Sequence, residues 1–413
     1  MPSGKRQLRR HAGQQAGGMM IGSMTVISIW GKLMRPAFLL GVLAVLLSVP
    51  GANGQTIKDM PPPPPVPKPK PTPTPKPPAE EVLDVVKVTS NLVMVPVSVT
   101  DSAGQAVQGL HVNDFRLEEE GRQQEIAEIG DPEAVPLEIA LLFDVSSSVS
   151  QKGFFAFQQE AAAAFLKQVM KPVDKAAIFT ITDRPILVQP LASTEIAAAK
   201  MLTIPAATTP VPTAFYDTVS AAAKYLNENS PGRHRRVIIV LSDGDDNFSE
   251  QIKDLTIAEV RASQSGNQTP AAARAGLQQR HRRAVLDVQQ AVQKADATFY
   301  SVNPGGPSVR LNDISMRAEL GMQSIADATG GTAFVPDSDK DLEAVFRQVA
   351  AELRGQYLLQ YYANAEASPG QFRRIKVSVP THSDARVRAR QGYYPKQDRI
   401  ESGRAKDDKK QVP

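Results

Sequence analysis

The sequence predicts an α/β fold, a doubly wound and mostly parallel sheet inserted in a small, sandwich-like β domain. Apolar strands alternate with amphipathic helices over residues 136–354, a pattern typical of a sheet covered on both faces. Short strands with alternating apolar residues precede this region, and more of them follow it. Neither group has enough strands for an independent sandwich, so we expect the two groups to pair.

Composition supports a folded chain and excludes several kinds of site. The chain has 413 residues, of which 42% are hydrophobic, and it has no cysteine. Disulfides, thiolate metal ligands and cysteine nucleophiles are therefore excluded. The formal net charge of +4 comes from the first 54 residues, because the remaining chain has 41 basic and 43 acidic residues. We expect no nucleic-acid partner, since the remaining chain has no basic excess.

Residues 1–54 are expected to be an export signal. Basic residues precede a 13-residue apolar run at 37–49, and the small residues Ala52 and Gly54 precede a cleavage site after Gly54. The run is shorter than the ~20 residues of a membrane span. An uncleaved anchor and a buried helix remain the alternatives. We expect an exported protein in the periplasm, the cell envelope or the extracellular space, with envelope association through its N-terminus.

Residues 55–80 are expected to be a proline-rich linker. Twelve of the 18 residues at 61–78 are proline, which favours a polyproline II spacer of roughly 55 Å. A ligand for a proline-binding domain is the alternative. At the other end of the chain, residues 396–413 are expected to be a disordered tail.

The β domain is predicted in two parts, residues 83–131 and residues 356–395. In the first part, four valines share one face of a strand at a period of two: Val93, Val95, Val97 and Val99. Further strands are expected in this part at 106–110, 115–120 and 124–129. The second part contributes apolar segments at 356–363, 373–380 and 386–394.

The α/β domain at 136–354 is predicted from its alternating elements. Strands are expected at 137–145, 175–182, 236–243, 298–303 and 332–336. Helices are expected at 154–170, 213–229, 282–295, 322–330 and 341–355. The helix at 213–229, for example, has Phe215, Val219, Ala222 and Leu226 along one face. The stretch at 262–276 has weak periodicity and is expected to be a long surface loop.

Oxygen-bearing side chains follow the predicted strands of this domain. Asp144 and Asp243 each end an apolar strand, and Thr213 opens a helix between them. The segment "DVSSS" adds Ser146 and Ser148. Sites in doubly wound sheets form outside the carboxyl ends of the strands, so these five residues are expected to meet there.

These five side chains are candidate metal ligands. Two carboxylates and three hydroxyls form an all-oxygen set, which suits Mg²⁺ or Mn²⁺ better than Ca²⁺. Two carboxylates balance the charge of a divalent ion and leave a coordination position for an outside acidic group. The partner would then be a protein with an exposed Asp or Glu.

The motif Asp-x-Ser-x-Ser, followed by a threonine and then an aspartate, resembles the metal-ion-dependent adhesion site (MIDAS) of the von Willebrand factor type A (VWA) domain. The segments "DVSSS", "TAFYD" and "LSDG" carry this resemblance. The flanks, over about residues 83–395, resemble exported bacterial proteins in which a VWA domain lies within a small β domain. The resemblance implies a Rossmann-like doubly wound fold, a metal site and protein binding of the cell-adhesion type.

Other interpretations of these residues remain open. The serines after Asp144 would cap the next helix, and Thr213 would be a helix N-cap. Asp245 and Asp246 fit a solvated loop, while a calcium loop lacks its glycine at Phe248. His234, among Arg233, Arg235 and Arg236, is expected on the surface.

The sequence lacks catalytic side chains that the two enzyme interpretations of these residues require. An aspartyl phosphotransferase usually has a general acid where Ser146 stands, and a serine hydrolase would need a base. None of the five histidines lies near a predicted strand end, and there is no GxSxG motif. We therefore expect a metal-dependent protein-binding module that is not an enzyme. The alternative is a structural envelope protein with a non-functional or purely structural metal site.

Overall fold

A computed structural model describes residues 91–146, 155–253, 261–262, 264–266, 269–306, 313–338, 341–363 and 370–395. The predicted export signal at 1–54, the proline-rich linker at 55–80 and the tail at 396–413 lie outside these residues, as does Ser148. Within the described ranges, no helix is long and apolar enough to cross a membrane.

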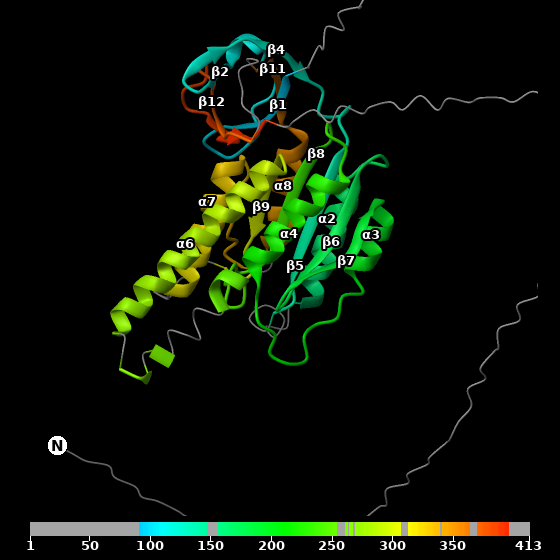
Figure 1. The fold of residues 1–413 in the computed structure, drawn as a ribbon. Helices are drawn as coiled ribbons and strands as arrows, with labels where there is room; N and C mark the ends of the chain where they lie inside the picture. The colour runs from blue at the N-terminus through cyan, green and yellow to red at the C-terminus, as the bar shows by residue number, and fades with distance from the viewer. Residues whose placement is uncertain are drawn as a thin grey trace, which may run out of the picture. The chain divides into compact units, whose positions relative to one another are not determined.

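A six-stranded sheet forms the centre of the α/β domain (Figure 1). Its strands, in spatial order, are β10 (Ala333–Phe334), β9 (Ala297–Val302), β8 (Arg235–Leu241), β5 (Leu137–Asp144), β6 (Lys175–Ile181) and β7 (Pro185–Ala192). Every neighbouring pair is parallel except β6 and the edge strand β7, which are antiparallel. The predicted doubly wound, mostly parallel sheet is confirmed.

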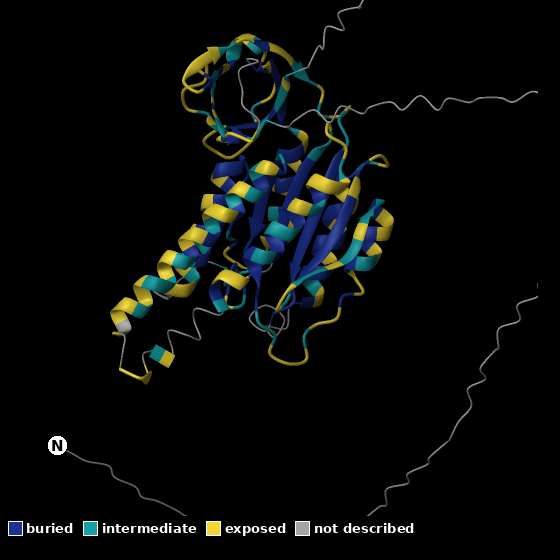
Figure 2. Cartoon of the chain, in the orientation of Figure 1, coloured by how far each residue is buried: buried dark blue, intermediate teal, exposed yellow. Residues whose placement is uncertain are grey.

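Helices cover both faces of this sheet. One face packs against α2 (Phe155–Val169), α3 (Thr194–Met201) and α8 (Leu342–Arg354). The other face packs against α4 (Phe215–Asn229), α6 (Pro270–Lys294) and α7 (Asp313–Thr329). Along β5, Leu141 and Phe143 join the first core and Leu142 joins the second. All of β5 is therefore buried, and the central strands are dark blue in Figure 2.

The β domain consists of two four-stranded sheets that share one hydrophobic core. The first has the order β13 (Arg386–Ala389), β1 (Leu92–Thr100), β11 (Tyr357–Tyr362) and β4 (Ile126–Gly130). The second has the order β14 (Gly392–Tyr393), β12 (Arg373–Ser378), β2 (Arg116–Glu119) and β3 (Arg122–Gln124). A short 3-10 helix, η1 (Val112–Asp114), precedes β2. Strands from before and after the α/β domain pair directly, β1 with β11 and β2 with β12.

The structure corrects two expectations about local structure. The predicted loop at 262–276 is wrong from Pro270 onward, because α6 begins there. The Thr269 hydroxyl accepts a hydrogen bond from Ala272 N at 3.3 Å, and Pro270 occupies the first turn, so "TP" starts the helix. The strand expected at 106–110 does not form, since Ala106 makes only an isolated bridge with Thr100.

Candidate metal site at the carboxyl edge of the sheet

Asp144 lies at the carboxyl end of β5 and is fully buried, with 0% of its surface exposed. Its Oδ1 accepts a hydrogen bond from Ser146 N at 2.7 Å. Its Oδ2 accepts one from Ser242 Oγ at 2.5 Å. The backbone turn and the neighbouring strand therefore fix both oxygens of this carboxylate.

Asp243 lies beside Asp144 because β5 and β8 pair up to Phe143 and Leu241. Asp243 is half-buried, and its Oδ1 accepts a hydrogen bond from Asp245 N at 3.3 Å. Burial raises the pKa of Asp144 to about 6, and the negative charge of Asp243 adds to this effect. The edge thus holds a buried carboxylate close to a second acidic group.

Thr213 lies in a loop that is hydrogen-bonded to the segments that follow β6 and β8, the two strands on either side of β5. The backbone N–H of Ala214 donates to Thr182 O at 2.7 Å, one residue beyond β6. Thr213 O accepts hydrogen bonds from Asn247 N at 3.1 Å and Phe248 N at 3.0 Å, in the loop after β8. Three loops therefore meet at the carboxyl edge of the sheet.

The structure brings four of the five predicted ligand residues to this edge: Asp144, Ser146, Thr213 and Asp243. Ser148 is outside the described residues, and metal binding by the set stays a prediction. Thr213 is not the N-cap of α4, because Ala214 occupies that position. That alternative is therefore wrong.

Asp246 is buried, with 3% of its surface exposed, so its expected place in a solvated loop is wrong. Its Oδ2 accepts hydrogen bonds from Tyr216 N at 2.8 Å and Ser249 Oγ at 2.6 Å. Tyr216 lies in the first turn of α4, so Asp246 supplies the cap that Ala214 lacks. Burial raises the pKa of Asp246, although these hydrogen bonds favour its charged form.

Ser242 contacts the candidate site, and the sequence did not predict it. It is fully buried, donates to Asp144 and accepts a hydrogen bond from Gly244 N at 3.0 Å. Gly244 has a positive φ of 74°, a conformation that favours glycine. The available signal was a hydroxyl directly before Asp243, at the end of an apolar strand.

The donor set fits a hard divalent cation. In the part of the chain that the structure describes, no group of three or more His, Cys, Asp or Glu side chains could hold a metal ion. A metal at this edge would therefore need hydroxyl or water oxygens in addition to the Asp144 and Asp243 carboxylates. Carboxylate, hydroxyl and water oxygens are the ligands that Mg²⁺ and Mn²⁺ prefer.

Comparisons with known proteins assign no family to this chain. Neither the protein-family models nor the curated proteins searched give a match. Proximal thread matrix protein 1 from mussel byssus is 13% identical, with a TM-score of 0.34 over 52% of this chain and 47% of that one. BatB from Bacteroides thetaiotaomicron is 15% identical, with a TM-score of 0.33 over 52% and 97%. The vWF domain of the type V pili tip protein Mfa5 from Porphyromonas gingivalis is 12% identical, with a TM-score of 0.35 over 52% and 94%. This chain therefore spans less than half the length of the mussel protein.

Proposed function

We propose that the chain is an exported, metal-dependent protein-binding module of the adhesion type. The carboxyl edge of the central sheet would hold one Mg²⁺ or Mn²⁺ in a MIDAS-type site. The ligands are Asp144, Ser146, Ser148, Thr213 and Asp243.

The observation that carries this proposal is the fully buried carboxylate of Asp144 beside Asp243. A buried charge is costly unless it is paired, and a like charge nearby adds to the cost. A divalent cation between the two carboxylates would neutralise both and offset that cost. The cation would also explain why hydroxyl side chains gather at the same edge.

The partner completes the metal in this proposal. Side chains supply at most five positions of the octahedron that Mg²⁺ requires. The remaining position suits the carboxylate of an exposed Asp or Glu on another protein. The loops around Pro212 and Phe248, both partly exposed, would then contact the surface around that carboxylate.

Export and domain division belong to the same proposal. We propose that residues 1–54 direct export and that the linker at 55–80 holds the folded part away from the envelope. The β domain, residues 83–131 with 356–395, would present the inserted α/β domain at 136–354. The direct pairing of β1 with β11 supports this division.

Two measurements test the proposed function. Calorimetry with Mg²⁺ and Mn²⁺ should show one site per chain that Asp243→Ala removes, while the exposed Asp287→Ala on α6 binds normally. Pull-down from the producing cell's envelope should recover a protein that EDTA releases and Asp243→Ala does not bind. Retention of the same partners by wild type and Asp243→Ala, with and without EDTA, would show that adhesion does not depend on metal.

The second candidate is a structural envelope protein whose carboxyl edge serves folding alone. Asp246 favours it, because this acidic residue caps α4 and needs no metal. The same calorimetry separates the two functions, since the structural protein shows no metal binding that depends on Asp243.

A further inference from the structure

A cavity of about 50 Å³ lies at the opposite, amino edge of the central sheet. The β domain contributes β1 and the segment after β13 to its lining, and the α/β domain contributes the start of β8 and the turn before β9. Its charged and titratable lining residues are Arg233, His234, Arg235, Arg236, Asp296 and Arg390. Four arginines and one acidic residue therefore line the cavity, and Asp296 already pairs with Arg390.

Arg236 has no carboxylate in its hydrogen bonds. Its guanidinium donates to Ala295 O at 3.0 Å, Ser230 O at 3.1 Å and Pro231 O at 3.0 Å. These carbonyls satisfy the NH1 and NH2 groups but leave the formal charge without an anionic partner in hydrogen-bond contact. Burial lowers the pKa of Arg236, as expected for a cation that has lost solvent.

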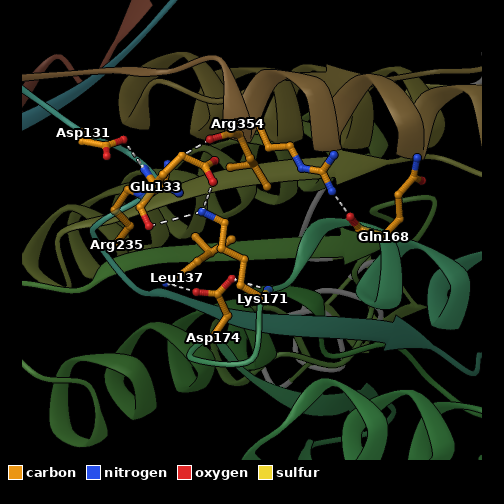
Figure 3. Close-up of polar contacts among 9 residues, drawn as sticks. Asp131, Glu133, Leu137, Gln168, Lys171, Asp174, Arg235 and Arg354 are labelled. Carbon is orange, nitrogen blue, oxygen red and sulfur yellow. Dashed lines mark hydrogen bonds and ion pairs between the residues drawn. The ribbon is translucent and has the colours of Figure 1, made fainter.

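Two acidic residues near Arg235, Glu133 and Asp174, have other partners (Figure 3). Glu133 pairs with Lys171. Asp174 accepts the backbone N–H of Leu137 at 2.8 Å and that of Lys171 at 2.7 Å. Arg235 itself donates a hydrogen bond to Leu353 O in α8 at 2.9 Å. This cation, too, has no carboxylate as a hydrogen-bond partner.

Three guanidinium Nε atoms at this cavity are buried without an acceptor among the described residues, those of Arg235, Arg236 and Arg390. Arg236 is 3% exposed and Arg390 is 9% exposed. Buried polar groups in proteins almost always have a hydrogen-bond partner, so unmatched donors on one cavity point to a missing acceptor. Glu138 lies opposite Arg236 in the β5–β8 register and does not line the cavity. Its Oε1 lies 2.9 Å from His234 Nδ1, and its buried Oε2 has no hydrogen-bond partner among the described residues, so its charge offsets part of that of Arg236.

We propose that this cavity binds one small oxyanion, a phosphate or a carboxylate, which joins the β domain to the α/β domain. Guanidinium groups match the oxygens of phosphate and carboxylate, often through two hydrogen bonds. The cavity has room for a few waters or one small anion, since a single water needs roughly 10–15 Å³ of such space. Arg390 would hold the anion from the β domain, and Arg233 and Arg236 from the α/β domain. Arg235 directs its guanidinium to the other face of the sheet, where it donates to Leu353 O at 2.9 Å.

This site is separate from the proposed metal site. Arg235 begins β8, and Asp243 follows the other end of the same strand. The anion proposal therefore stands or falls independently of the metal, and Asp144→Asn should bind phosphate as the wild type does.

Calorimetry with inorganic phosphate on the full chain, against sodium chloride at equal ionic strength, tests the proposal. Wild type should bind one phosphate, and Arg390→Gln and Arg233→Gln should each weaken binding about tenfold, the loss expected for one charge-assisted hydrogen bond. Acetate in place of phosphate distinguishes the sources, because tighter acetate binding assigns the cavity to a carboxylate. Arg282→Gln, an exposed arginine on α6, is the matched control and should bind normally.

Arg233 is exposed, so Arg233→Gln keeps the test decisive even where Arg390→Gln fails to fold. Equal binding by Arg233→Gln, Arg282→Gln and wild type would overturn the proposal. Phosphate and acetate that bind no better than chloride would overturn it as well.

Discussion

The two edges of the central sheet carry opposite charges. Aspartates gather at the carboxyl edge, where Asp144, Asp243 and Asp246 lie. Arginines gather at the amino edge, where Arg235 and Arg236 begin β8. Part of this difference follows from the fold, because helices begin near the carboxyl edge of a parallel sheet and end near its amino edge. Unpaired helix N–H groups favour acidic side chains, and unpaired helix carbonyls favour basic ones.

Helix ends account for some of these charges but not for all of them. Asp246 binds the first turn of α4, and Arg236 binds Ser230 O and Ala295 O just beyond α4 and α6. Asp144 caps no helix in the described residues; it binds Ser146 N and Ser242 Oγ. At the carboxyl edge, the charge that helix ends do not explain is the one that indicates a ligand. At the amino edge, the helix-end carbonyls satisfy N–H groups of Arg236 but do not neutralise its charge. Charged side chains that bind helix ends can thus be distinguished from those that are candidates for binding a ligand.

The largest expected effect on metal binding comes from Asp144→Asn. The single side-chain oxygen of asparagine can still accept the hydrogen bond from Ser146 N, while its amide NH2 would have to donate to Ser242 Oγ. Asparagine cannot supply a negative charge to a metal. Mg²⁺ and Mn²⁺ binding should be lost in calorimetry. At pH 8 the metal-free variant should be more stable than wild type by about 2–3 kcal/mol. The pKa of Asp144 is raised from 3.8 to about 6, so its ionisation is less favourable by roughly that amount in the folded chain than in the unfolded chain.

Asp246→Asn is the matched variant at the same edge. It weakens the cap of α4 and should lower the free energy of unfolding by about 1 kcal/mol. Chemical denaturation without metal compares the two. Should both variants lose stability alike, Asp144 is a structural aspartate and the division between the two kinds of charge fails.

The pH dependence of stability gives the next effect. His281 on α6 is buried, and its Nδ1 lies 3.1 Å from Tyr216 Oη. Burial lowers the pKa of His281 to about 3, and the charges of Arg317 and Arg280 lower it further. The unfolded chain takes up this proton near pH 6.5 and the folded chain does not, so stability falls as pH drops from about 6.5 to about 3. The loss from this group is on the order of 4 kcal/mol.

His281→Asn should flatten that dependence, since asparagine does not titrate. Urea denaturation of both proteins at several pH values measures the difference between them, in which the carboxylates common to both cancel. Parallel stability curves for wild type and variant between pH 6.5 and pH 4 would show that His281 is protonated in the folded chain.

Ser242→Ala should have a smaller effect. It removes the hydroxyl that donates to the buried carboxylate of Asp144, which costs about 1.5–3 kcal/mol for a hydrogen bond to a charged group. Metal affinity should fall about tenfold, because the carboxylate loses a group that orients it.

Ser301→Ala on β9 is its control. Ser301 is also fully buried, but its Oγ has no hydrogen-bond partner in the described part of the chain. Denaturation midpoints should therefore separate the two serines. Equal losses would assign the effect to packing and remove Ser242 from the site.

The sequence predicted the fold and the strand-end aspartates because both depend on local patterns. The apolar run of β5 ends in Asp144, and a buried parallel strand has that appearance on both faces. Asp246 was misjudged because its partner, Tyr216 N, lies 30 residues away and the contact exists only in the folded chain. His234, expected on the surface, is half-buried for the same reason, since it contacts Glu138 on β5. The periodicity of α6 is weak at its start, where the side chains are mostly exposed, and only the cap at Thr269 marked its first turn.

The smallest expected effect, that of Asp296→Asn, is also the sharpest test of anion binding at the amino edge of the sheet. Asp296 has a positive φ of 56°, a conformation that asparagine tolerates, so Asp296→Asn changes charge with little change in backbone preference. Loss of its ion pair with Arg390 should cost about 1 kcal/mol, because Asp296 remains partly exposed and solvent screens the pair. Phosphate binding should become roughly threefold to tenfold tighter, since the cavity loses its acidic lining residue and Arg390 becomes free to bind the anion. Asp287→Asn, an exposed aspartate on α6, should change neither quantity. Unchanged or weaker phosphate binding by Asp296→Asn would mean that phosphate binds outside this cavity, and that the arginines at this edge serve the helix ends and the domain junction.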